Sequence, residues 1–124
     1  MSQIVDRFEA AVQALVADGP VKARLLRAYC EFLEDLQQVD LPIASKQDFS
    51  ELHTALHCVP PMGKIDCVKA SVQKMSPTEA WWHACTIVRL YTEILAMEQA
   101  ARPQPEVVLE EPEELPPRFL VSGN

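Results

Sequence analysis

Residues 76–101 read SPTEAWWHACTIVRLYTEILAMEQAA and carry the clearest helix signal in the chain. They open with Ser76-Pro77-Thr78-Glu79, which combines an N-cap hydroxyl, a proline suited to the first helical position and a glutamate that can complete a capping box. No further proline follows until Pro103, so the helix is expected to reach about Ala101. With the usual rise per residue, a helix of this extent is about 37 Å long.

Apolar side chains cover most of the circumference of this expected helix. One row comprises Trp81, Ala84, Val88, Tyr91 and Leu95, and a second comprises His83, Ile87, Leu90, Ile94 and Met97. A polar edge remains at Trp82, Thr86, Arg89 and Glu93. A helix that is apolar on nearly every side is usually buried on nearly every side. We therefore expect this helix either at the centre of the fold, packed by the other helices, or with its second row against a partner subunit.

Four shorter helical segments precede it. Apolar residues recur every three to four positions within residues 3–17, 20–39, 46–58 and 63–75, and no stretch alternates with period two for long enough to form a strand. Pro60-Pro61 separates the last two segments, which are expected to form one broken helix or a short helical hairpin. The predicted fold class is all-α, a four- or five-helix bundle with short loops between antiparallel neighbours.

The composition divides the chain into two parts. Residues 1–102 form the expected helical bundle domain. Residues 103–124 contain five of the ten prolines and five Glu against one Arg, so they carry −4 of the formal charge of −7. Because proline cannot continue a helix and like charges repel one another, this segment is expected to be a disordered, acidic, proline-rich tail.

Length and charge argue against several functional classes. The chain has 124 residues, the size of one domain, and its 11 Lys and Arg against 18 Asp and Glu argue against a nucleic-acid-binding face and a polybasic membrane anchor. Its uncharged stretches are too short to span a bilayer, and Asp6, Arg7 and Glu9 interrupt any signal sequence. Four cysteines without a CxxC pair indicate reduced thiols and a cytoplasmic location.

Histidines and cysteines offer two weak chemical hypotheses. His53 and His57 share a helix face, and Cys58 follows them, but on the expected helix these three side chains diverge and match no zinc-binding spacing. We therefore expect no metal site and no cofactor. Cys58 and Cys67 flank the double proline, where a redox-sensitive disulfide is conceivable without any sign of a lowered thiol pKa. His83, inside an apolar row, is expected to be neutral and hydrogen-bonded.

The residues expected to contact a protein partner fall in two places. Trp82 lies on the polar edge near Arg89, where it is either a binding anchor or is covered by another helix or by the tail. Phe119-Leu120-Val121 forms an apolar island among the acids and prolines of the tail, as does Val107-Val108-Leu109. Such islands order on a partner, or dock back onto the bundle of their own chain.

The segment 20–39 has an unusual charge order. Lys22, Arg24 and Arg27 come first and Glu31, Glu34 and Asp35 come last, which opposes the helix dipole. One hypothesis is an antiparallel homodimer in which the basic half of one helix meets the acidic half of its symmetry mate. The alternative is that other helices of the same bundle supply the partners.

These observations favour a small cytosolic, non-enzymatic protein–protein interaction module, such as an adaptor, an assembly factor or an inhibitor. An enzyme is not expected, because no nucleophile, base and orienting group are seen to converge. A metal- or redox-responsive bundle using the His and Cys residues is the alternative. A third hypothesis is an acidic nucleic-acid mimic that blocks a basic protein, although the charge is modest for that role.

Overall fold

The computed structural model describes residues 2–101. Its α-helices are α1 (Ser2–Leu15), α2 (Val21–Ala28), α3 (Ile43–Leu56), α4 (Cys67–Lys74) and α5 (Pro77–Ala101). A π-helical turn, η1 (Tyr29–Leu33), and a 3-10 turn, η2 (Gln38–Asp40), lie between α2 and α3. Within residues 2–101 the only β contact is an isolated bridge between Met62 and Ile65, so the all-α prediction is confirmed. The predicted tail, residues 103–124, lies outside the described residues.

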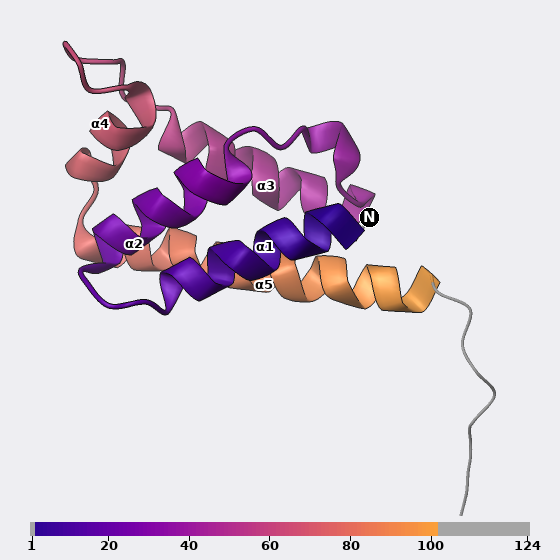
Figure 1. Ribbon diagram of the computed structural model, residues 1–124. Coiled ribbons are helices and arrows are strands. Elements are labelled where there is room, and N and C mark those ends of the chain that lie inside the picture. The colour runs from indigo at the N-terminus through magenta and orange to yellow at the C-terminus, as the bar shows by residue number, and fades with distance from the viewer. Residues whose placement is uncertain (1, 102–124) are drawn as a thin grey trace, which may run out of the picture.

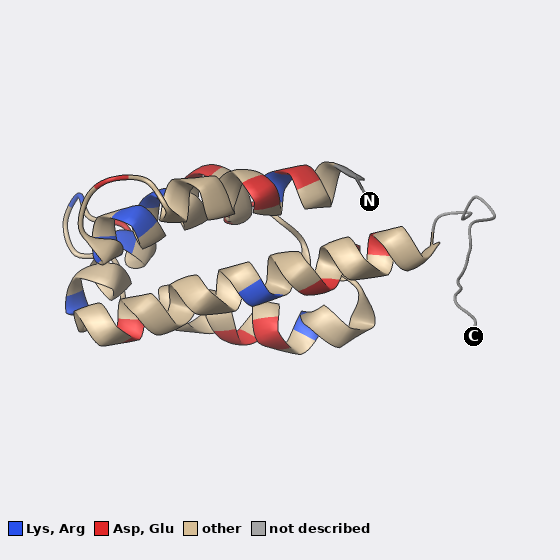
Figure 2. Ribbon diagram, turned by 90° about the horizontal axis from the view of Figure 1, so that it is seen from below, with Lys and Arg blue, Asp and Glu red and all other residues tan. Residues whose placement is uncertain are grey.

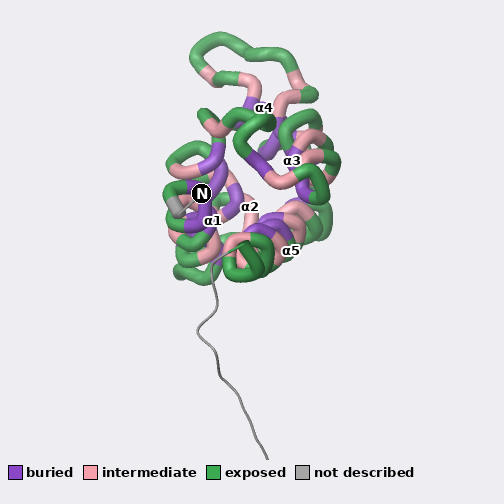
Figure 3. The backbone as a smooth tube through the Cα atoms, turned by 90° about the vertical axis from the view of Figure 1, so that its right-hand side faces the viewer, coloured by how far each residue is buried: buried purple, intermediate pink, exposed green. Residues whose placement is uncertain are grey.

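The long helix α5 runs the length of the bundle and packs against α1, α2 and α3 (Figure 1). α1 runs antiparallel to α5, and α4 packs against α2 and α3 (Figure 1). In a view along the bundle, the buried positions of these helices face a common centre (Figure 3). The largest fully buried hydrophobic side chains are Phe8, Leu25, Tyr29, Leu33, Leu52, Leu56, Ile87, Leu90 and Ile94.

The two apolar rows of α5 contribute unequally to this core, and Ala84, Tyr91 and Leu95 of the first row are only partly buried against it. Ile87, Leu90 and Ile94 of the second row are fully buried. In the first row, by contrast, 56% of Trp81 and 41% of Val88 remain exposed. The prediction that α5 is buried on nearly every side is therefore wrong. α1, α2 and α3 all pack on its inner side, and no helix of residues 2–101 covers its outer side.

The predicted start of α5 is confirmed by its hydrogen bonds. The backbone N–H of Glu79 donates to Ser76 Oγ at 3.0 Å, and the N–H of Ser76 donates to Glu79 Oε1 at 2.9 Å. Together these bonds form a capping box that satisfies backbone donors without partners inside the helix.

We expect Ser76→Ala to lower the free energy of unfolding by about 1 kcal/mol, because the N–H of Glu79 loses its acceptor. Urea denaturation measures this change. Ser76→Thr keeps a hydroxyl at the cap and serves as the control. Equal stabilities for the alanine and threonine variants would show that the capping box does not stabilise α5.

The second predicted helix is shorter than expected. α2 ends at Ala28, and the chain passes into η1, where the N–H of Glu34 donates to the Tyr29 carbonyl oxygen at 2.8 Å. Tyr29 and Leu33, the first and last residues of this turn, are both fully buried. Val39, the last residue of the predicted segment, is 75% exposed, because α2 and η1 have ended before it.

The third and fourth helices begin elsewhere than predicted. α3 starts at Ile43, ahead of residue 46, because Pro42 supplies the extended residue that precedes a helix. α4 starts at Cys67, later than residue 63, because Gly63 turns the chain with a φ of 61°. Asp66 then caps α4, its carboxylate accepting from the N–H of Lys69 at 2.9 Å. The two helices contact each other, and the loop between them holds Pro60-Pro61.

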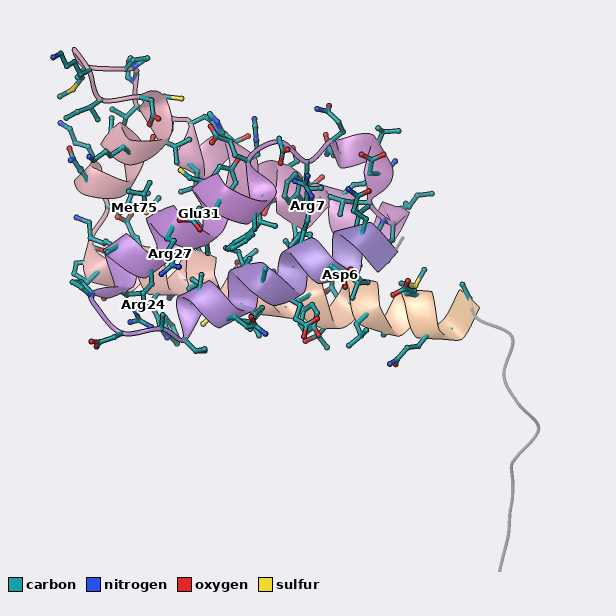
Figure 4. The ribbon with its side chains drawn as sticks, viewed as in Figure 1. Asp6, Arg7, Arg24, Arg27, Glu31 and Met75 are labelled. Atoms are coloured by element: carbon teal, nitrogen blue, oxygen red, sulfur yellow. The ribbon has the colours of Figure 1, made fainter. Side chains whose placement is uncertain are left out.

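Backbone carbonyl oxygens of neighbouring helices accept hydrogen bonds from the basic residues at the start of α2. Lys22 Nζ donates to the carbonyl oxygen of Gln73 in the last turn of α4, at 3.0 Å. Arg24 donates to the carbonyl oxygens of Leu15 at 2.6 Å and Gly19 at 2.8 Å, at the end of α1 (Figure 4). The carbonyl end of a helix carries partial negative charge. Lys22 and Arg24 oppose the dipole of α2, but each lies at the carbonyl end of a neighbouring helix, where a cation is favourable.

The acidic end of this segment is also matched within the chain. Arg27 pairs with Glu31 at 3.4 Å, one turn along the same segment (Figure 4). Arg7 of α1 forms an ion pair with Asp35. Partners inside one molecule therefore account for the charge order, and the homodimer hypothesis loses the observation that motivated it.

Candidate functional site: the outer face of α5

Both tryptophans of the chain lie on the surface of α5. Trp82 is 67% exposed and Trp81 is 56% exposed. Adjacent residues on a helix point about 100° apart, so the two indoles lie on different sides of the outer face. Charged residues are sparse along α5 when this face is turned toward the viewer (Figure 2). We call the side of the helix that carries the exposed residues Trp81, Trp82, Cys85, Val88 and Arg89 the outer face of α5. It is a mainly apolar surface with an indole on either side.

Trp81 borders a groove where α5 meets the end of α1 and the start of α2. We call it the Trp81 groove. Its volume is about 470 Å³, and it is lined by Leu15, Val16, Val21, Arg24, Trp81, Ala84, Cys85, Val88 and Arg89. Its floor is mainly apolar, its two charged residues are both arginines, and no carboxylate lines it.

Trp82 borders a second, smaller groove between α3 and α5, which we call the Trp82 groove. Its volume is about 290 Å³, and its lining is Asp48, Glu51, Leu52, Trp82, His83, Thr86 and Arg89. Arg89 lines both grooves and pairs with Asp48 at 3.3 Å and with Glu93 at 3.9 Å. The pair with Asp48 joins α5 to α3.

Part of the predicted contact surface can be placed. The structure brings Trp82 and Arg89 to one groove and leaves both half or more exposed. Phe119, Leu120 and Val121 lie outside the described residues. Trp81 was not predicted as a surface residue, because its apolar row looked like core. The sequence signal for its exposure was the presence of two apolar rows, because a helix with one core-facing side cannot bury both.

Three side chains on the opposite side of the core form a polar cluster. The fully buried Tyr29 shares a hydrogen bond of 2.9 Å between its hydroxyl and His53 Nδ1. The His53 and His57 rings lie 4.1 Å apart, and His57 Nδ1 bonds to the His53 carbonyl oxygen at 2.8 Å. Burial, and secondarily Glu34, raises the pKa of Tyr29, so its hydroxyl stays protonated. We regard the cluster as a link between η1 and α3.

Acid should weaken this link. Desolvation of the ring lowers the pKa of His53 from 6.5, the positive charge of His57 lowers it further, and Glu34 opposes both. A lowered folded-state pKa means that the unfolded chain binds the proton more tightly. The contribution of His53 is therefore present above its unfolded pKa of about 6.5 and is lost as the pH falls through the folded-state value.

We expect the free energy of unfolding to fall between about pH 7 and about pH 5, and His53→Gln to reduce that fall. Burial also lowers the pKa of His83, which leaves a smaller fall of the same sign in the variant. Urea denaturation at several pH values measures both slopes. Identical slopes for the two proteins would exclude His53 as a source of acid sensitivity.

Within residues 2–101, no arrangement of side chains supports the metal or redox hypothesis. Among residues 2–101, no three or more His, Cys, Asp or Glu side chains are grouped so that they could hold a metal ion. His53 and His57 are stacked, while Cys58 points to Ser71, with 3.9 Å between Sγ and Oγ. All four cysteines are free thiols. In the same part of the chain, no helix combines the length and hydropathy needed to cross a membrane.

No protein-family model matches the sequence, and no match was found among curated proteins or solved structures.

Proposed function

We propose that this protein is a cytosolic, non-enzymatic protein–protein interaction module, and that its partner contacts the outer face of α5. The observation that carries the proposal is the exposure of both tryptophans on one helix, at 56% and 67%. Tryptophan is mostly buried in folded proteins and is enriched at the energetic centres of interfaces.

The surroundings of the two indoles support the proposal. Val16 and Val88 extend the apolar surface from Trp81, with 75% and 41% of their surfaces exposed. Contiguous exposed apolar surface typically marks a contact site, whereas single exposed apolar residues need no explanation. Arg89 supplies a charged group between the grooves, a common arrangement at interfaces.

Affinity capture from a lysate of the source cell tests the proposal. The baits are the full chain, the double variant Trp81→Ala/Trp82→Ala, and the control Val39→Ala/Ile43→Ala. The control removes apolar groups that are 75% and 85% exposed but lie away from α5. We expect a protein retained by the wild type and the control and lost by the double variant. Identical retention by all three baits would contradict the proposal.

A further inference from the structure

We propose that the Trp81 groove binds the segment Glu113–Val121 of the same chain. The inference rests on the proposed function only in treating the outer face of α5 as a contact surface. It commits to an occupant that is part of the chain but lies outside the described residues.

Charge complementarity favours this occupant. The lining of the groove includes Arg24 and Arg89 and no carboxylate, and Arg89 is already paired with Asp48 and Glu93. Arg24 donates to two backbone carbonyls through Nε and Nη1, and no ion pair with a carboxylate satisfies it within residues 2–101. The segment 103–124 carries five Glu against one Arg, two of them at Glu113-Glu114. An apolar floor beside Arg24 suits an acidic segment with large apolar side chains.

The length of the chain beyond α5 selects which apolar island fits. Trp81 lies twenty residues before Ala101, so along the helix axis they are about 30 Å apart. Fully extended, the chain from Ala101 spans about 20 Å to Val107 and about 60 Å to Phe119. Phe119-Leu120-Val121 therefore reaches Trp81 with slack, whereas Val107-Val108-Leu109 reaches only the near end of the groove, at Val88 and Arg89.

Fluorescence quenching of Trp81 by acrylamide tests the inference in the full chain. Trp82→Phe leaves Trp81 as the sole indole. In that background we compare the unchanged tail with Phe119→Ser/Leu120→Ser/Val121→Ser and with the control Val107→Ser/Val108→Ser/Leu109→Ser, which removes three apolar side chains at the island that falls short of Trp81. If the segment occupies the groove at least about half the time, the first variant raises the quenching constant about twofold and the control leaves it unchanged.

Three results would overturn the inference. Equal quenching constants for all three proteins would show that the tail does not cover Trp81. An equal rise in both tail variants would show that the far island has no special role. A quenching constant that depends on protein concentration between about 1 and about 100 μM would assign the groove to a second copy. The quenching measurement needs no partner, so a negative result contradicts tail docking and not the proposed function. A negative capture experiment contradicts the proposed function and not tail docking.

Discussion

Replacing Phe8 by alanine is expected to lower the free energy of unfolding by about 3–5 kcal/mol. Phe8 is fully buried on α1 and meets Phe49 of α3 edge to face, with 6.3 Å between ring centroids. The truncation removes the transfer free energy of the ring, its aromatic contact and the atoms that fill the centre of the bundle. Natural domains of this size are stable by only about 5–15 kcal/mol, so the variant should be close to unfolding.

Urea denaturation followed by circular dichroism measures this loss. Val16→Ala is the matched control, because Val16 follows α1 directly and is 75% exposed, so its removal should change stability by less than about 0.5 kcal/mol. If Phe8→Ala cost less than about 1 kcal/mol, the burial of Phe8 against Phe49 in the core would be incorrect.

The double variant Trp81→Ala/Trp82→Ala should separate binding from stability. Since both indoles are more than half exposed, each substitution should change the free energy of unfolding by about 1 kcal/mol or less. Loss of an interface anchor costs about 2 kcal/mol or more, so the dissociation constant for a captured partner should rise about 30-fold or more. Calorimetric titration of the purified partner measures this change.

The single variants Trp81→Ala and Trp82→Ala then show which of the two grooves accounts for the change in the dissociation constant. A partner held in the Trp82 groove should lose most affinity with Trp82→Ala, and one that displaces the tail should depend on Trp81. An unchanged dissociation constant for the double variant, with the fold intact, would remove the outer face of α5 from the interface.

Features set by local chemistry were predictable from the sequence. The start of α5 was predicted because Ser76 and Glu79 form their capping box within one turn, whatever the rest of the chain does. The grouping of Ile87, Leu90 and Ile94 in one apolar row followed from their helical spacing.

Features that depend on which helices meet were not predictable. Trp81 and Ile87 both belong to apolar rows with helical spacing, so the sequence does not distinguish them. Because α1, α2 and α3 all pack on one side of α5, Ile87 is buried and Trp81 is exposed. Similarly, the charge order of α2 looked unfavourable because its partners, the carbonyl ends of α1 and α4, are distant in sequence and close in space.

Hydroxyl-radical footprinting of a captured complex examines the surface without changing a residue. Tryptophan and methionine both react readily, and the chain offers Trp82 on α5 and Met62, 51% exposed, on the loop between α3 and α4. We expect the oxidation rate of Trp82 to fall on complex formation while that of Met62 stays the same. Protection of Met62 with no change at Trp82 would place the partner elsewhere and contradict the assignment of α5 as the interaction surface.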